Sequence, residues 1–286
     1  RGEYNNSQIA EQQDLEEVEK QLAEYENTLP ENTAQNPQNA GTQVKMPSSW
    51  YTTIPAYIST EDGKTIKRSV KVASVVAVAT GNGETVPVPN DFYYVGGTIS
   101  SGVVISDNKE DQNKYVDEEN GDVPAGVVYN EDGTINKESS DLKGNQFVWI
   151  PVASAREYQR DFTYPNNFSS NTENTFTDTG YLPTDIQPTT DDATNNETAE
   201  RTEVLKYNGF YIARYEAGED DSNVVSKQNV TVYTDKTQEE FKAIGKTMYG
   251  DSSQYVKSAM CSGIQWDMVM KFVDGKTDGN ENTYDV

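Results

Sequence analysis

The sequence contains no histidine and only one cysteine, Cys261. The missing histidines exclude Ser-His-Asp and Cys-His nucleophile arrangements, histidine general bases and histidine-ligated zinc. A single thiol excludes an internal disulfide framework and any metal or redox site built from paired cysteines. Several common catalytic and metal-binding classes are therefore removed by composition alone.

Positive charge and long apolar runs are also scarce. The 286 residues include 23 Lys and Arg against 47 Asp and Glu, which gives a net charge of -24. We therefore expect no nucleic acid as a partner, because nucleic acid repels such a polyanion. No apolar run approaches the roughly 20 residues of a membrane span. We expect membrane attachment only through a missing segment upstream of Arg1, and the chain resembles a processed product.

What the sequence does have is tyrosine and polar residues. Apolar residues make up 34% of the chain, and 18 residues are tyrosine. This composition favours an extracellular, β-rich protein, and we expect one attached to a cell surface. The length suffices for one large domain or two small ones.

The segment YNGFYIARYEAG at residues 207–218 is the densest β-forming stretch. Its alternation places Phe210 and Ile212 on one face and Tyr211 and Ala213 on the other, which predicts a central strand buried on both sides. Arg214 and Glu216 follow, and we expect them to bond to each other or to a neighbouring loop in a structural role.

The pattern of residues 144–152 predicts a second core strand near the first in the fold, with Phe147 and Trp149 on one face and Val148 and Ile150 on the other. Short strands are expected at 92–95 and 102–106, a β-like stretch at 224–233, a helix at 237–248 capped by Thr237, and a last helix from about Ser258 or Ser262 to Val273. The apolar face of the last helix comprises Ile264, Met268 and Phe272, widened by Trp266, Val269 and Met270.

The N-terminal part divides into three pieces. Residues 1–30 predict an amphipathic helix with a heptad stripe that ends before Pro30, and it either packs on its own domain or forms a stalk. Residues 31–49 form a linker that we expect to be flexible and exposed through Val44. Residues 50–85 predict a small β unit, with strands at 51–60 and 65–79 around a turn at 61–64. A larger domain follows at 86–286.

Two long polar loops interrupt the larger domain, at 107–143 and 162–202. The acidic residues of the first do not have the spacing of a calcium loop, so we expect a solvated loop. The pairs Asp191–Asp192 and Asp220–Asp221 have the chemistry of an acid and a base, although adjacent carboxylates in polar loops are more typically solvated.

Three segments resemble a known family: GNQFVWIP at 144–151, GFYIARYE at 209–216, and the helix with QWD at 265–267 and Phe272. Together they resemble the opening half of a formylglycine-generating-enzyme-like (sulfatase-modifying-factor) domain, whose fold is related to C-type lectins. The lead-in VPVP at 86–89, with FYYVGG at 92–97 and GVVISDN at 102–108, is similar to the version on surface proteins of gut Firmicutes.

The resemblance covers roughly residues 86–275 and implies an α+β, loop-rich C-type-lectin-like domain. In those surface proteins the domain often follows a pilin-like membrane helix, and some members are variable ligand-display proteins linked to diversity-generating retroelements. The family's catalysts bind copper with two cysteines in the later half, which this chain does not contain. Cys261 matches no family catalytic residue, so we interpret it as a small buried hydrophobic side chain.

These observations predict a non-catalytic cell-surface protein that binds or displays a glycan or protein ligand. We assign no catalytic, cofactor-binding or metal-binding residue. Ligand contact is expected from the two long loops, where tyrosines and asparagines suit carbohydrate or protein contact; examples are Tyr164, Asn166, Asn167, Phe168 and Tyr181. The alternatives are a structural pilin-like subunit that self-assembles through its N-terminal helix, and an oxygen-dependent or hydrolytic enzyme.

Overall fold

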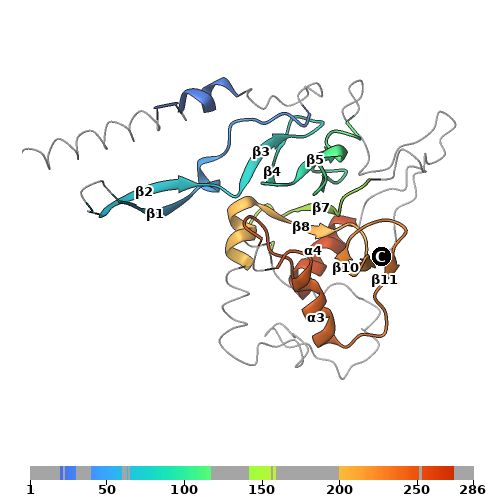
Figure 1. Cartoon of the computed structure of the whole chain (residues 1–286). Helices are drawn as coiled ribbons and strands as arrows, with labels where there is room; N and C mark the ends of the chain where they lie inside the picture. Colours follow the sequence, from blue (N-terminus) through green and yellow to red (C-terminus); the bar gives the residue numbers. More distant parts are fainter. Residues whose placement is uncertain are drawn as a thin grey trace, which may run out of the picture.

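The computed structural model describes residues 20–21, 23–29, 40–59, 63, 65–116, 142–155, 157–158, 200–250 and 253–273. These residues form small antiparallel sheets with a few short helices, so the protein is α+β, as the sequence predicted (Figure 1). The strands β1 to β6 are Thr52–Ser59, Thr65–Val72, Val75–Ala79, Thr85–Pro89, Tyr93–Gly96 and Val104–Ser106. The later elements are β7 (Gln146–Pro151), β8 (Gly209–Ala213), β9 (Gly218–Asp220), β10 (Asn223–Val225), β11 (Thr231–Val232), α3 (Gln238–Thr247) and α4 (Gly263–Val273).

The largest sheet has four antiparallel strands in the order β5-β6-β7-β8. The sequence predicted that β7 lies near β8 in the fold, and this is confirmed, because the two strands pair in the register Val148↔Ile212 and Ile150↔Phe210. The prediction that β8 is a central strand is wrong, because among the described strands β8 lies at the edge of this sheet, whereas β6 and β7 are its inner strands. Both faces of β8 are nevertheless covered, which is why its side chains are apolar on each side.

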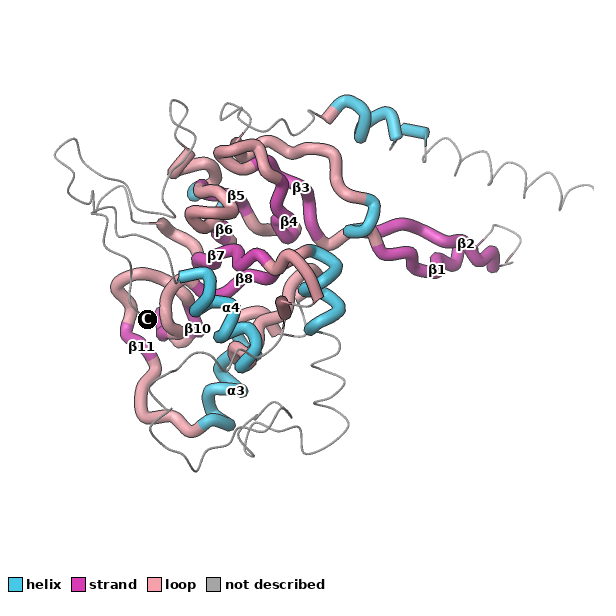
Figure 2. The backbone as a smooth tube through the Cα atoms, turned by 180° about the vertical axis from the view of Figure 1, so that it is seen from behind, coloured by secondary structure: helices cyan, strands magenta, loops and turns pink. Residues whose placement is uncertain are grey.

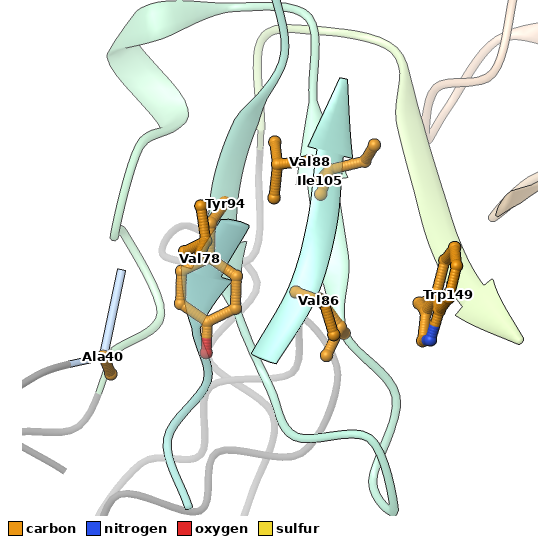
Figure 3. Close-up of a cluster of buried hydrophobic side chains, with 8 residues drawn as sticks. Ala40, Val78, Val86, Val88, Tyr94, Ile105 and Trp149 are labelled. Carbon is orange, nitrogen blue, oxygen red and sulfur yellow. The ribbon is translucent and has the colours of Figure 1, made fainter. Parts of the chain in front are cut away.

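One face of the sheet packs against the β3–β4 hairpin. Val78 and Val86 of this hairpin share a core with Ile105 of β6 and Trp149 of β7, and Figure 3 shows Val86, Val88 and Ile105 grouped in this core, with Trp149 on its β7 side. The domain boundary expected between residues 85 and 86 falls inside the hairpin, whose last pair is Ala79↔Thr85. The two predicted units therefore share one hydrophobic core.

The other face of the sheet carries a second core. It contains Ile150, Phe210 and Met268, with Ile264 and Phe272 packed against it, so the predicted apolar face of α4 is confirmed. Trp266 was expected to widen that face but is 54% exposed. It lies two positions from both Ile264 and Met268, which places it on the opposite side of the helix.

A helical segment at residues 200–207 joins this second core and was not predicted. Val204 and Leu205 pack with Phe210, and the helix passes directly into β8. Tyr207, which the sequence analysis assigned to the strand, is the last helical residue. Its ring contacts Trp50 edge to face, with centroids 5.9 Å apart.

The N-terminal segment joins the core earlier than expected. Ala40 and Val44 are buried, and the amides of Gly41 and Val44 donate to the carbonyls of Ala79 and Ala77. Residues 40–44 lie along β3, so the prediction of an exposed linker through Val44 is wrong for Ala40 and Val44, whereas Thr42 and Gln43 are exposed. Residues 23–28 are helical, in keeping with the expected helix, and the remaining parts of the 1–30 prediction lie largely outside the described residues.

Strands β1 and β2 form a separate two-stranded hairpin, here called the arm (residues 52–72). In Figures 1 and 2 the arm projects away from the rest of the described fold. The single long strand predicted at 65–79 is interrupted at residues 73–74. Ser74 accepts the amide of Asn90 at 2.9 Å and its hydroxyl bonds to Tyr207, which turns the chain from the arm into β3.

A small sheet in the order β10-β9-β11 follows β8. The turn between β9 and β10 has positive φ at Asp221 and Ser222, which suits a tight hairpin turn. Helix α3 begins at the predicted cap, where Thr237 and Glu240 form a reciprocal capping box. None of the helices within the described ranges is both long and apolar enough to cross a membrane.

Candidate functional site

Two polar clusters hold the ends of the long loops. The first, the strand-end cluster, centres on Asp111, which is 1% exposed. Its carboxylate accepts the Ser106 hydroxyl at 2.6 Å, the Gly144 amide at 2.9 Å and the Lys143 amide at 3.0 Å. Asp111 precedes residues 117–141 and Gly144 follows them, so this carboxylate fastens the two ends of that segment to each other.

Asp107 makes a second connection in the strand-end cluster. One carboxylate oxygen accepts the Asn145 amide at 2.7 Å, and the other accepts the Asn145 side chain at 2.9 Å and the Tyr249 hydroxyl at 2.7 Å. Burial raises the pKa of Tyr249, and the Asp107 carboxylate raises it further. The Tyr249 ring packs on Phe92 and Phe147, so this bond joins the chain after α3 to the sheet.

The start of β7 completes the strand-end cluster. Ser226 donates from its hydroxyl to the Gln146 carbonyl at 3.0 Å and from its amide to Asn145 Oδ1 at 2.9 Å. Arg214, expected to bond to Glu216 or to a loop, donates from its guanidinium to Gln146 Oε1 at 2.8 Å and stacks over Tyr215. Arg214 thus has the expected structural role, and its partner lies on β7. Glu216 is exposed.

The second cluster, the stem cluster, holds the ends of residues 159–199. The Tyr158 hydroxyl donates to the Glu200 carboxylate, and Arg201 donates to the Tyr158 carbonyl at 2.5 Å and the Ala155 carbonyl at 2.7 Å. Burial raises the pKa of Tyr158, and its hydrogen bond to Glu200 raises it further. The chain therefore leaves and re-enters the fold at residues bonded directly to one another.

Helix α4 begins at the stem cluster. The Ser262 hydroxyl donates to Glu200 Oε1 at 2.9 Å and accepts the Gln265 amide at 3.2 Å, while Gln265 Oε1 accepts the Ser262 amide at 3.1 Å. The last two bonds form a reciprocal cap. Burial, with the Glu200 and Asp267 carboxylates nearby, raises the pKa of Cys261 to about 12.

In this geometry the polar groups of the stem cluster have structural roles. Glu200 already accepts two hydroxyls, Ser262 caps a helix, and Cys261 is a half-buried thiol that stays protonated near neutral pH. A thiol in that state is a weak nucleophile, as the sequence interpretation of Cys261 expected. No group of three or more metal-ligating side chains occurs within the described ranges.

The other sequence candidates are more widely spread. Asp220 and Asp221 lie exposed at the β9–β10 turn, where Lys227 pairs with Asp220 at 3.3 Å. Asp191, Asp192 and the loop residues Tyr164, Asn166, Asn167, Phe168 and Tyr181 lie outside the described residues. The structure thus brings none of these candidates into either polar cluster.

Sequence reasoning missed the buried carboxylates. Asp107 and Asp111 were both expected in a solvated acidic loop, which is wrong for Asp111 and for the bonded side chain of Asp107. The available signal was SDN at 106–108, directly after an apolar strand, since Asp and Asn there fix the local turn. The side chain of Asn108 indeed accepts the Glu110 amide and starts the short helix η3 (Lys109–Asp111).

Comparison of the chain with models of known protein families, with curated proteins and with solved structures finds no match. The resemblance to the formylglycine-generating-enzyme-like family therefore stays a prediction.

Proposed function

We propose that this protein is a non-catalytic, extracellular, cell-surface protein that binds or displays a glycan or protein ligand. The observation that supports the proposal most is the fastening of both long segments at their ends. Asp111 joins the two ends of one segment, and Tyr158, Glu200 and Arg201 join the two ends of the other.

Fastened ends are what a display scaffold needs. A sequence can vary between two fixed points without disturbing a core that is already complete on either side. Here the described members of both cores come from the strands and helices on either side of residues 117–141 and 159–199. The parts of the proposed contact segments between these anchors, at 117–141 and 162–199, can therefore differ in sequence at little cost to folding.

The composition of the second segment suits ligand contact. Residues 162–199 contain Tyr164, Phe168 and Tyr181 among many asparagines and threonines. Tyrosine offers a flat apolar face with a polar tip, and asparagine offers adaptable hydrogen bonds. Both suit a glycan ring or a protein surface. The proposal assigns this role to the segment as a whole and to none of its residues singly.

The described polar groups also support the proposal, because the protein itself already satisfies their hydrogen bonds. The carboxylates of Asp107, Asp111 and Glu200 each accept at least two hydrogen bonds from the protein itself. A general base needs a lone pair directed at its substrate. These three carboxylates are used instead to connect elements that are distant in sequence.

The test is an equilibrium binding screen of the folded protein against a glycan array and a panel of purified cell-surface proteins. Saturable binding of at least one of them is the expected result. An absence of binding while circular dichroism shows folded protein would contradict the proposal. Copper uptake with oxygen-dependent turnover of cysteine-containing peptides would contradict its non-catalytic part.

A structural role, as a pilin-like subunit that assembles through its N-terminal helix, is the second candidate. It is favoured by Tyr25, which belongs to the heptad stripe of residues 1–30 and is 56% exposed. The domain leaves this stripe residue uncovered, as helix-mediated assembly requires. Native protein extracted from its membrane in detergent should then sediment as a polymer, and a purely monomeric species would contradict this role.

A further inference from the structure

Three Asn-Gly dipeptides occur in the chain, at 82–83, 120–121 and 208–209, and the first and last lie within the described residues. An asparagine before glycine is prone to spontaneous deamidation, because glycine has no side chain to shield the backbone nitrogen that attacks the asparagine amide. Asparagine is accordingly counted among the thermolabile residues. The structure holds the two described dipeptides in very different ways, so each serves as a reference for the other.

The fold requires the dipeptide at 208–209. Asn208 ends the helical segment 200–207 with a φ of 62°, in the left-handed region that asparagine tolerates better than most residues. Gly209 starts β8, and a Cβ there would overlap the Trp149 ring and the Ile150 carbonyl. Position 208 thus favours asparagine or glycine, position 209 needs glycine, and the two requirements together produce a chemically labile pair.

Neither reacting group at this joint is bonded to β7. Asn208 is exposed, and its side chain has no hydrogen bond to another described residue. Its backbone carbonyl accepts the Val152 amide at 2.9 Å, so Asn208 and Val152 are a hydrogen-bonded pair at the end of the β7–β8 ladder. Such pairs alternate with non-hydrogen-bonded ones, and Gly209 faces Pro151 in the adjacent pair, so the ladder does not use the Gly209 nitrogen.

The dipeptide at 82–83 is held by several hydrogen bonds. Asn82 Oδ1 accepts the Thr80 hydroxyl at 2.6 Å and the Glu84 amide at 3.3 Å. Asn82 Nδ2 donates to the Glu84 carboxylate at 2.7 Å. The Gly83 nitrogen, which would have to attack, donates to the Thr80 carbonyl at 2.9 Å. Reaction at Asn82 therefore requires the loss of bonds that Asn208 does not make, and each lost bond raises the barrier.

We propose that Asn208 is a site of spontaneous deamidation in the folded protein. The Gly209 nitrogen attacks Cγ of Asn208, a new N–Cγ bond forms, and the Cγ–Nδ2 bond breaks. Ammonia leaves with the proton that the Gly209 nitrogen gives up, which leaves a succinimide ring. Water then opens this ring at either of its carbonyls and yields aspartate or isoaspartate.

Isoaspartate changes the main chain at a place with no spare room. It inserts the former side-chain methylene into the main chain before Gly209, and the former backbone carbonyl becomes a free carboxylate. The segments on either side of the joint both contribute to the second core, through Val204 and Phe210, so a longer connection disturbs their packing. The chain that contains isoaspartate should therefore unfold at lower urea than the unmodified chain. This inference is independent of the ligand-binding proposal, because residue 208 lies outside both contact segments.

The test is prolonged incubation of the whole folded chain at mildly alkaline pH, followed by digestion and mass spectrometry of the peptides that contain Asn82 and Asn208. Asn208 should convert to aspartate and isoaspartate at least about tenfold faster than Asn82, because the Asn82 site must first lose its hydrogen bonds. The chain unfolded in urea is the reference, and there the two sites should convert at similar rates, since both precede glycine.

Two variants separate the causes. Asn208→Gly keeps the left-handed conformation and removes the amide, so both the isoaspartate at this position and the loss of stability on incubation should be absent. Glu84→Ala removes one bond that holds the Asn82 side chain, and conversion at Asn82 should rise by about threefold or more. Equal conversion of Asn82 and Asn208 in the folded chain overturns the proposal. An isoaspartate-containing chain with an unchanged urea midpoint overturns its structural consequence.

Discussion

Asp111 anchors the chain just before β7. Its carboxylate is buried and accepts bonds from one hydroxyl and two backbone amides. Asp111→Asn replaces one acceptor oxygen with a donor that faces other donors. We expect the free energy of unfolding to fall by about 2–3 kcal/mol, measured by urea denaturation. The neighbouring control Glu110→Gln, whose exposed side chain pairs with Lys143, should cost less than about 0.5 kcal/mol. Equal losses in the two variants would contradict this account.

Cys261 should be unreactive in the folded protein. Its pKa of about 12, against 9.0 for a free thiol, leaves about a thousandfold less thiolate near pH 8. Since the thiolate is the reacting species, iodoacetamide should modify native protein at least about 100-fold more slowly than urea-unfolded protein. The measurement is the labelling rate by intact mass. Equal rates before and after unfolding would show that the thiol is neither buried nor protonated as described.

At the residue scale, the sequence predicted side chains whose role follows from their neighbours along the chain. Thr237 was recognised as a helix cap because its partner lies three residues away. The roles of Asp107 and Tyr249 were not recognised, because they are separated by 142 positions and meet only in the folded protein. The same limit applies to Tyr158 and Glu200.

At the element scale, Gly209 sets the closeness of β8 to β7. A Cβ at this position would overlap the Trp149 ring and the Ile150 carbonyl. Gly209→Ala should therefore reduce the free energy of unfolding by about 1–3 kcal/mol, because β7 would have to shift. Gly250→Ala is the control, since a Cβ there would lie 3.5 Å from the nearest atom, the Lys246 carbonyl oxygen. Chemical denaturation measures the free energy of unfolding of both variants. An unchanged free energy of unfolding in Gly209→Ala would contradict the β7–β8 register.

Strands and helices were predictable where apolar side chains recur at a regular spacing along the chain. Alternation in residues 146–151 and 209–213 gave the correct faces, since each face packs against a different core. Alternation contains no information on how many strands flank a strand, so the edge position of β8 was missed. The break at Ser74 was also missed, because the run from 65 to 79 is rich in β-branched residues and the contacts that interrupt it come from Asn90 and Tyr207.

At the scale of the whole molecule, stability should decrease in alkali. Burial raises the pKa of Tyr51 to about 12 and that of Cys261 to about 12, and it also raises the pKa values of Tyr94, Tyr158 and Tyr249. The unfolded chain loses these protons near pH 9 to 10, while the folded chain retains them. Stability contributed by these groups is therefore complete below about pH 9 and is lost as the pH rises through 12.

Urea titrations between about pH 7 and pH 11.5 measure this decrease. Tyr158→Phe combined with Cys261→Ser should make the decrease shallower, since two of the raised groups are then absent. With no histidine in the chain, no imidazole titration is superimposed near neutral pH. A free energy of unfolding that stays constant above pH 9 would contradict the burial of these groups.

The overall charge, and the core that the β3–β4 hairpin shares with the larger sheet, are properties of the whole molecule. Composition predicted a highly acidic, β-rich protein, the family resemblance implied the α+β class, and the α+β class is confirmed. The expected boundary at residues 85–86 depended on glycines and prolines along the chain. The contacts that place β3 and β4 on the larger sheet are long-range, and a linear pattern does not contain them.

The most direct measurement of the central proposal compares the intact chain with one in which residues 162–199 are scrambled, with length and composition kept. Both are applied to the same glycan array and cell-surface protein panel, and both are melted by circular dichroism. The account expects saturable binding by the intact chain, a loss of about tenfold or more on scrambling, and nearly equal melting temperatures, because the stem cluster and both cores are unchanged. Equal binding by the two chains, or no binding by the folded intact chain, would contradict it.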